Sequence, residues 1–327
     1  MIDLVEDFTK HLTKSLEIGR QIKFSSTNKK IANVVISGLG GSGIGGTIVG
    51  QLVAQEIKVP IIVNKDYSIP QFVDENTLFI ASSYSGNTEE TLYALEAAEK
   101  NGAEIACVTS GGAIEKIAKE KGYNYIIIPG GLPPRAAFGL AFPQLLFVLN
   151  QYNLVSNVFE EGIEHTIKSI NSSDSEIRQQ AKYVAGCLKD TIPVIYTDAS
   201  FEGVGVRFRQ QLNENSKMLC WHHAIPEMNH NELVGWAGGN DNLAVIIFRN
   251  ETDFYRSKKR MDINKSIIRN YTTNIIEVFS KGLSAIERTL YLIHFGDHIS
   301  VELAHLKQID ATEVDVITGL KDELSKI

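Results

Sequence analysis

Cysteine is scarce in this sequence. Its 327 residues include three cysteines, Cys107, Cys187 and Cys220, which lie far apart and form no Cys-x-x-Cys pair. This pattern predicts small buried apolar side chains in a reducing compartment, and it argues against a disulfide framework or a zinc-cysteine site.

Basic runs and long apolar runs are also lacking. The net charge is −7 and the longest basic run is Lys258-Lys259-Arg260, whereas a protein that binds nucleic acid regardless of sequence needs a basic face. No stretch approaches 18 uncharged apolar residues, and the first 20 residues carry acids. We therefore expect neither a membrane span, nor a signal peptide, nor a nucleic-acid partner, and we expect a cytoplasmic protein.

Short apolar runs alternate with helical patterns along the first half of the chain. An amphipathic helix, marked by Val5, Phe8, Leu12 and Leu16, opens the sequence. Continuous apolar strands between helices predict an α/β fold with a parallel sheet covered on both faces. The predicted strands are 33–37, 57–64, 77–82, 104–109 and 124–129, and the predicted helices are 44–55, 88–101, 113–121 and 135–152.

The alternation starts again in the second half. Ser173 or Asp174 is a candidate cap for a helix, and Ser284 with Glu287 forms a capping box for a long helix that ends near Gln308. Two similar α/β domains, 1–152 and 153–327, are therefore predicted. Further predicted elements are strands at 192–197, 242–249 and 273–279 and a last amphipathic helix at 314–327.

The segment Gly38–Gly46 follows the first strand and opens a helix, where glycines let a ligand approach the backbone. Gly38, Gly40 and Gly43 match the dinucleotide pattern G-x-G-x-x-G, and Asp66 lies near the place of a ribose-binding acid. Tight packing of helix against strand is another reason for such glycines. The pattern of this loop does not by itself determine which ligand it binds.

A second loop, Ser82 to Thr88, follows the third strand and also leads into a helix. Its hydroxyl and N–H groups converge on a helix N-terminus without a lysine, which suits a phosphate monoester. A cap formed by Asn87 with Glu90 accounts for only part of the pattern, since it does not need Ser83, Ser85 and Thr88 together. We therefore predict a phosphate site.

Arg135 follows two prolines after the fifth strand, at or near the start of the next helix. An arginine there is unfavourable for the helix dipole, so we favour a guanidinium that faces an oxyanion over a surface ion pair. Glu214, between Asn213 and Asn215, is a candidate general base.

Histidines gather in the second half of the chain. His222, His223 and His230 lack metal-ligand spacing, whereas His294 and His298 lie four residues apart on the long predicted helix. Such a pair is more typical of a packed or subunit-facing surface than of a metal centre. We therefore expect neither a catalytic metal nor a cofactor.

Five segments in order resemble the bifunctional phosphoglucose/phosphomannose isomerases of the sugar isomerase (SIS) superfamily. They are GLGGSGIGG (38–46), SYSGNTEET (83–91), GGLPPRAAFG (130–139), LNENSK (212–217) and MNHNELVGW (228–236). The resemblance implies two SIS domains, each a five-stranded parallel sheet flanked by helices, in a homodimer whose active site is shared between subunits.

The resemblance also implies roles for individual residues. Glu214 would be the base that moves a proton between C1 and C2, His230 of the neighbouring subunit would assist ring opening, and Arg135 would steady the enediolate. Lys307 matches a further lysine of the family, close to Ser300, although residues 310–314 read DATEV where relatives read DPTPV. The implied phosphate-binding residues are Gly41, Ser42, Ser83, Ser85 and Thr88.

The predicted reaction is a metal-independent interconversion of glucose 6-phosphate and mannose 6-phosphate with fructose 6-phosphate. Three alternatives remain at this point. They are a non-catalytic sugar-phosphate sensor, a nicotinamide-dependent oxidoreductase based on G-x-G-x-x-G, and a related amino-sugar phosphate isomerase. The sensor has no need of Glu214 or His230, and the oxidoreductase leaves the second loop unexplained.

Overall fold

The computed structural model describes residues 1–324 and 326, which form two compact units. The N-terminal unit contains Glu6–Ser172 and Gly282–Leu290, and the C-terminal unit contains Met1–Val5, Ser173–Lys281 and Tyr291–Ile327. The two units are interleaved in sequence, and the domain boundary near residue 153 stays a prediction.

A parallel five-stranded sheet forms the centre of the N-terminal unit, in the order β2-β1-β3-β4-β5. All five strands lie where the sequence predicted them, except that β2 begins after Pro60 and β5 ends at Ile127. The bounds are β1 Asn33–Ser37, β2 Ile61–Asn64, β3 Thr77–Ser83, β4 Glu104–Thr109 and β5 Asn124–Ile127.

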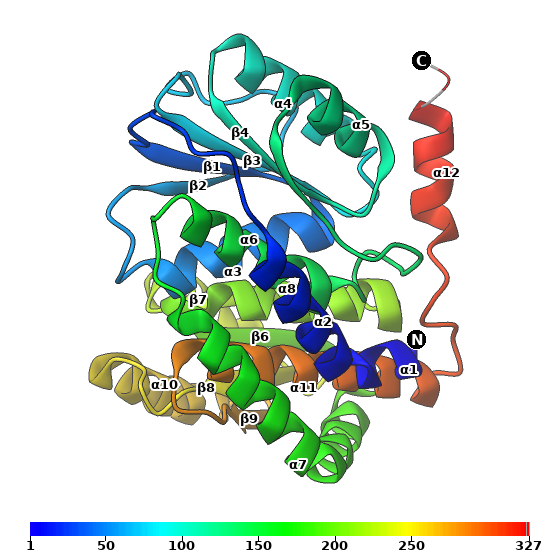
Figure 1. Cartoon of the computed structure of the whole chain (residues 1–327). Coiled ribbons are helices and arrows are strands. Elements are labelled where there is room, and N and C mark those ends of the chain that lie inside the picture. Colours follow the sequence, from blue (N-terminus) through cyan, green and yellow to red (C-terminus); the bar gives the residue numbers. More distant parts are fainter. Residues whose placement is uncertain (325, 327) are drawn as a thin grey trace. The chain divides into compact units, whose positions relative to one another are not determined.

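Helices cover both faces of this sheet, as predicted. Figure 1 shows α4 (Glu89–Lys100) and α5 (Gly112–Lys121) on one face, and α3 (Gly40–Val53) and α6 (Phe138–Gln151) on the other. Alternate strand residues such as Val35, Phe79 and Cys107 pack under α4 and α5. The sheet is therefore buried on both sides, which explains its continuous apolar strands.

Two predicted helices in this half are present but have other bounds than expected. The opening helix is divided at Asp7 into α1 (Ile2–Glu6) and α2 (Phe8–Gln21), and α2 packs on α6. The helix predicted from Arg135 begins at Phe138, so Arg135 lies in the preceding turn. That turn is closed by Ala137, whose N–H donates to Pro134 O.

The C-terminal unit contains a parallel sheet of four strands, in the order β7-β6-β8-β9. The α/β class is confirmed, but the expectation of five strands is wrong for this sheet. Strand β7 escaped prediction because its residues, WHHAI, are polar at its exposed end. The bounds are β6 Ile192–Asp198, β7 Trp221–Ile225, β8 Leu243–Arg249 and β9 Ile275–Phe279.

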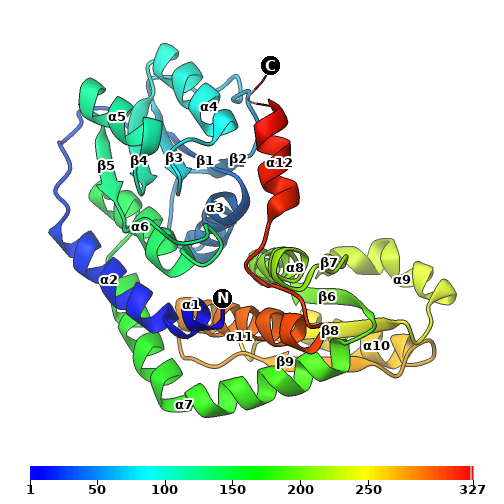
Figure 2. The ribbon, with the colours of Figure 1, turned by 90° about the vertical axis from the view of Figure 1, so that its right-hand side faces the viewer.

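One face of the four-stranded sheet packs on α8 (Glu202–Ser216), where Phe208 contacts Phe248 of β8. The other face packs on α10 (Tyr255–Ile268) through Met261 and Ile268. Figure 2 shows α8 and α10 on these two sides. The short and terminal elements are η1 Ala199–Phe201, η2 Glu227–His230, α9 Glu232–Gly235, η3 Trp236–Gly238 and α12 Asp315–Leu324.

Two long helices contribute residues to both units. Helix α7 (Val158–Leu188) runs without interruption through Ser173 and Asp174, so the cap predicted there is wrong. Helix α11 (Ala285–Leu306) begins with the predicted capping box, in which Ser284 and Glu287 exchange hydrogen bonds.

The three cysteines differ in how deeply they are buried. Cys107 is buried as predicted, and this burial raises the pKa of its thiol to about 12. Cys187 and Cys220 are only partly buried, so the prediction was wrong for them.

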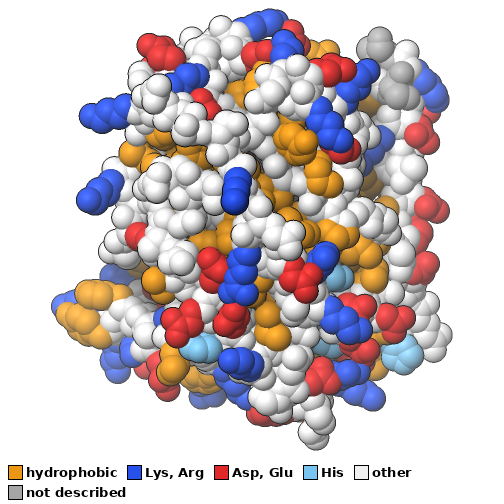
Figure 3. All heavy atoms as spheres, viewed as in Figure 1, with side chains coloured by type: hydrophobic (Ala, Val, Ile, Leu, Met, Phe, Trp, Pro, Cys, Tyr) orange, Lys and Arg blue, Asp and Glu red, His pale blue; other side chains and the backbone are white. Residues whose placement is uncertain are grey.

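Acidic and basic side chains intermingle on the face shown in Figure 3. Within the described residues, no helix is long and apolar enough to span a membrane.

Candidate active site

The carboxyl ends of the five parallel strands meet at one edge of the N-terminal sheet. From β1 the chain continues to β2 on one side, whereas β3 pairs with β1 on the other side. Such a reversal of strand order opens a crevice between the loops that follow the two central strands, and ligands of open α/β sheets bind there. Here those loops are Gly38–Leu39, with the glycines that open α3, and Tyr84–Thr88.

Hydroxyl groups organise the loop after β3. Ser83 Oγ and Thr88 Oγ1 are 2.8 Å apart, and Ser83 Oγ also accepts the N–H of Gly86 at 3.1 Å. Ser85 is exposed, and its Oγ accepts the N–H of Asn87 at 3.2 Å. Hydrogen bonds of its own hydroxyls thus fix the backbone of this loop at the end of the buried strand β3.

Asn87 does not cap α4, contrary to the prediction. Its Oδ1 accepts the N–H of Ala113 at 2.9 Å and so ties the loop to the start of α5. The N-cap residue is Thr88, which makes no side-chain cap hydrogen bond within the described part of the chain. The first N–H groups of α4 therefore remain suited to an anion.

Gly86 permits the close approach of this loop to the next one. Its φ is +68°, and a Cβ there would lie 1.8 Å from Gly111 O. A side chain at this position is excluded both by backbone conformation and by space.

Three loops meet at this edge. The N–H of Tyr84 donates to Ser42 Oγ at 3.3 Å, and a Cβ on Gly41 would lie 3.2 Å from Pro134 O and 3.7 Å from the Cα of Arg135. The structure therefore brings the glycine loop, the hydroxyl loop and the proline loop together. We call Gly41, Ser42, Ser83, Ser85, Thr88 and Arg135 the switch-point cluster.

Tyr84 anchors this edge of the sheet, a role that the sequence pattern did not indicate. Its hydroxyl donates to Pro129 O at 3.1 Å and accepts the N–H of Leu132 at 3.0 Å, which fixes the segment before Arg135. Arg135 itself is buried, with 4% of its surface exposed. A buried guanidinium on a loop that lies against the glycine loop is suited to holding an oxyanion.

In the C-terminal unit, Glu214 lies on the last turn of α8 and is partly buried. The residues after it are fixed by Ser300, whose Oγ accepts from Asn215 at 2.9 Å and whose carbonyl accepts from Ser216 Oγ at 2.6 Å. Lys307 Nζ donates to Ser216 O at 2.8 Å, and burial lowers the pKa of Lys307. The structure thus brings Lys307 and Ser300 to the end of α8 that carries Glu214.

A buried ion pair holds α8 against α11. Arg207 Nη2 and Gln211 Nε2 donate to Asp297 at 2.6 and 2.9 Å. Burial raises the pKa of Asp297 although both donors oppose the shift. Fixing α8 in this way also fixes the direction of its last turn.

His230 ends the short helix η2 after β7, and its side chain is exposed. The segment around it is anchored, since Met228 is fully buried and Asn229 Nδ2 donates to Asn264 Oδ1 at 2.7 Å. Two residues on, Glu232 binds several side chains. Its carboxylate contacts Tyr196 Oη, Trp221 Nε1 and His223 Nδ1.

Glu214 lies at the amino ends of the strands of the four-stranded sheet, and His230 lies at their carboxyl ends. Helix α8 runs back from the carboxyl end of β6, so Glu214 comes shortly before β7 starts at Trp221, whereas His230 follows the end of β7. The first and last Cα atoms of the five-residue strand β7 are about 13 Å apart at ~3.3 Å per residue. A single C-terminal unit therefore keeps the two side chains apart.

The two histidines of β7 each contact a glutamate and are not arranged around a common point. His222 Nε2 lies 3.6 Å from Glu202 and His223 Nδ1 lies 2.8 Å from Glu232. Burial lowers the pKa of His222.

The chain is similar to known proteins in both sequence and fold. The family model of the bacterial phospho-glucose isomerase C-terminal SIS domain matches residues 177–324. The bifunctional phosphoglucose/phosphomannose isomerase of Caldicellulosiruptor bescii is 37% identical and covers 100% of this chain and 99% of its own length. The enzyme of the same name from Aquifex aeolicus is 34% identical, with 90% of each chain covered.

A relative with another activity also matches. The D-glucosamine-6-phosphate 4-epimerase of Sulfolobus acidocaldarius is 31% identical, covering 93% of this chain and 92% of its own. In fold, the C-terminal domain of glucosamine-fructose-6-phosphate aminotransferase from Francisella tularensis gives a TM-score of 0.77 at 12% identity, with 96% of this chain and 97% of that chain covered. At this identity the last likeness concerns the fold alone.

Proposed function

The chain belongs to the family of bifunctional phosphoglucose/phosphomannose isomerases, and from this membership we propose that it interconverts glucose 6-phosphate and mannose 6-phosphate with fructose 6-phosphate. The observation that carries the proposal is the switch-point cluster together with Glu214 and Lys307 at the end of α8. The family resemblance predicted these residues, and each lies on a segment anchored by its own hydrogen bonds.

The residues of the switch-point cluster other than Arg135 are proposed to hold the 6-phosphate. Ser83, Ser85 and Thr88 offer hydroxyls at the start of α4, and Gly41 and Ser42 bring the start of α3 to the same edge. Neutral donors and two helix N-termini suit a dianionic phosphate monoester. This grip far from the reacting carbons would orient the substrate for the proton transfer.

Proton transfer between C1 and C2 requires one base and a means to stabilise the enediolate. Glu214 is proposed to remove the proton from one carbon and return it to the next. Arg135 and Lys307 are proposed to stabilise the developing oxyanion, an effect typically worth several kcal/mol. Epimerisation at C2 follows if the base can reach either face of the enediol, and no step of this scheme uses a metal or a redox cofactor.

His230 is proposed to assist ring opening from the neighbouring subunit of a homodimer. The placement of Glu214 and His230 at opposite ends of the strands of one sheet supports this, because a second copy can supply what a single copy keeps apart. His230 is exposed on an anchored turn, as a residue that serves a partner's site should be.

A cytoplasmic location is also proposed. The three thiols form no disulfide, which fits this location.

Amino-sugar phosphate chemistry is a second candidate, because a D-glucosamine-6-phosphate 4-epimerase is 31% identical over 93% of this chain. A 6-phosphate grip serves both reactions equally well. The position of the reacting carbon differs, so substrate turnover separates the two.

The deciding experiment is a coupled assay in EDTA with glucose 6-phosphate, mannose 6-phosphate and glucosamine 6-phosphate as separate substrates, performed well below the melting temperature. We expect fructose 6-phosphate from the first two and no epimer from the third. Activity restored only by a divalent metal would overturn the metal-free scheme. Turnover of glucosamine 6-phosphate alone would assign the second candidate.

A further inference from the structure

Two histidines of α11 and one aspartate of α7 form a cluster that the proposed reaction does not use. Ligand atoms of Asp174, His294 and His298 all lie within 4.8 Å of one another, and all three residues belong to the C-terminal unit. His294 and His298 are four residues apart, so both imidazoles leave the same side of α11. Their ring centroids are 4.6 Å apart with the planes at 85°.

Both imidazoles are buried, with 1% of His294 and 0% of His298 exposed. Neither ring nitrogen of His298 has a hydrogen-bond partner among the residues that the structure describes. An imidazole offers a donor and an acceptor, and burying both without partners is unfavourable. A cation bound by a ring nitrogen would compensate for this loss.

The buried imidazoles are in the form that binds metals. Burial lowers the pKa of His298 to about 4 and that of His294 well below its ordinary value, so both rings are neutral near pH 7. Neutral imidazole is the common metal ligand of proteins.

Asp174 supplies the negative charge at the solvent-facing side of the cluster. Its side chain is 37% exposed, and Arg178, one turn along α7, binds its Oδ2 through Nη2 at 2.7 Å. Carboxylates that bind metals are commonly oriented by such hydrogen bonds. The guanidinium opposes a second cation, so the imidazole nitrogens have to supply most of the binding. Ca²⁺ and Mg²⁺ prefer oxygen ligands, whereas two imidazoles and a carboxylate suit Zn²⁺.

We propose that Asp174, His294 and His298 form a binding site for a divalent transition-metal ion of the zinc type. The ion would join α7 to α11 and stabilise the C-terminal unit. Helix α11 contacts α8 through Asp297 and Ser300, so its histidines lie on a different side of the helix from the residues that fix Glu214. The role of this ion is structural, and the proposed isomerase reaction does not require it.

The test uses the tag-free full chain, stripped with EDTA, dialysed and then titrated with Zn²⁺ by calorimetry and with Co²⁺ by visible absorption. We expect one ion per chain, Co²⁺ bands of the intensity typical of four- or five-coordinate sites, and a melting temperature that rises with Zn²⁺. Isomerase activity is not a readout, so failure of this proposal is distinct from failure of the proposed function.

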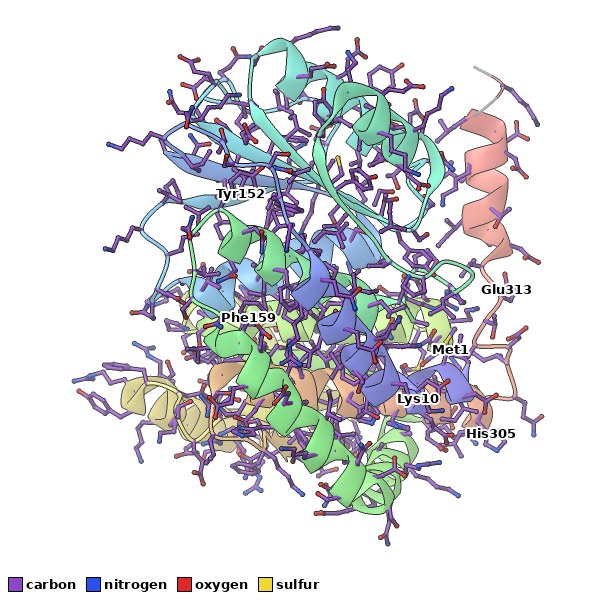
Figure 4. All side chains as sticks on the ribbon, viewed as in Figure 1. Met1, Lys10, Tyr152, Phe159, His305 and Glu313 are labelled. Atoms are coloured by element: carbon purple, nitrogen blue, oxygen red, sulfur yellow. The ribbon has the colours of Figure 1, made fainter. Side chains whose placement is uncertain are left out.

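Two variants locate the ion. His298→Leu keeps a buried apolar side chain, and Asp174→Asn keeps size at a partly exposed position; each should weaken Zn²⁺ binding by at least about 10- to 100-fold. His305→Ala is the matched control, because His305, labelled in Figure 4, is exposed on the same helix and should leave the affinity unchanged. The proposal is wrong if the stripped protein binds no Zn²⁺, or if Asp174→Asn and a folded His298→Leu bind it like the wild type.

Discussion

Glu214 depends for its position on residues that do not touch a substrate. Ser300 fixes Asn215 and Ser216, Lys307 binds the carbonyl of Ser216, and Asp297 holds the preceding turns of α8. The glutamate therefore projects from a helix end whose backbone is held at several points. Such preorganisation is what a base for a carbon acid needs.

Replacing Glu214 with Gln should separate binding from chemistry. The amide keeps the size of the side chain and cannot accept the proton, so we expect kcat to fall by about 100- to 10,000-fold while glucose 6-phosphate still binds. Calorimetry measures the binding and the coupled assay measures kcat. Glu202→Gln, at the other end of α8, is the control and should keep the wild-type rate. Near-normal turnover by Glu214→Gln would remove Glu214 from the role of base.

Single residues could be predicted where the residue type by itself indicates ligand chemistry. The hydroxyls of the loop after β3 and Arg135 stand out because their residue types repeat known phosphate and oxyanion chemistry. The contacts of Tyr84 were missed and the role of Ser300 was left open, since both depend on residues far away in sequence, Pro129 and Leu132 for Tyr84 and Asn215 for Ser300. Asn87 was misjudged for the same reason, because its partner Ala113 begins another helix.

Among the elements, strands of the first sheet were predictable because both of their faces are buried. Each is therefore an uninterrupted apolar run bounded by glycine, proline or polar residues. Strand β7 is an edge strand with exposed Trp221 and two partly exposed histidines, and nothing in its pattern indicates burial. The continuity of α7 through Ser173 and Asp174 was equally hidden, because good capping residues also occur within long helices.

Loop glycines provide a test of how closely the loops must approach. Gly86 and Gly122 both have positive φ, +68° and +71°, but a Cβ on Gly86 would lie 1.8 Å from Gly111 O and one on Gly122 meets nothing within 4 Å. We expect Gly122→Ala to cost about 1 kcal/mol of unfolding free energy. Gly86→Ala should cost about 2–4 kcal/mol, because displacement of packed backbone adds to the conformational cost.

Urea denaturation of the two glycine variants measures this difference, and the KM for glucose 6-phosphate provides a second readout. Gly86→Ala should raise KM because it moves the hydroxyls of Ser83 and Ser85, whereas Gly122→Ala should leave KM unchanged. Equal effects of the two variants on stability and KM would show that the close approach of the loops is unimportant.

For the whole molecule, the sequence correctly predicted the α/β class, and the family resemblance predicted the kind of reaction that we propose. The strand count of the second sheet was overestimated, since the family pattern was applied to both halves alike. The placement of Glu214 and His230 at opposite ends of the strands of one sheet is visible only in three dimensions. This separation is the structural reason to expect an active site made by two copies of the chain.

Mixing two inactive variants tests this shared site most directly. Glu214→Gln and His230→Ala, each inactive alone, are unfolded together, refolded and assayed with glucose 6-phosphate. In a twofold dimer every mixed pair contains one site with both residues intact, so random pairing should restore about one quarter of the wild-type rate. A mixture as inactive as either variant alone would contradict a site that combines Glu214 of one subunit with His230 of the other.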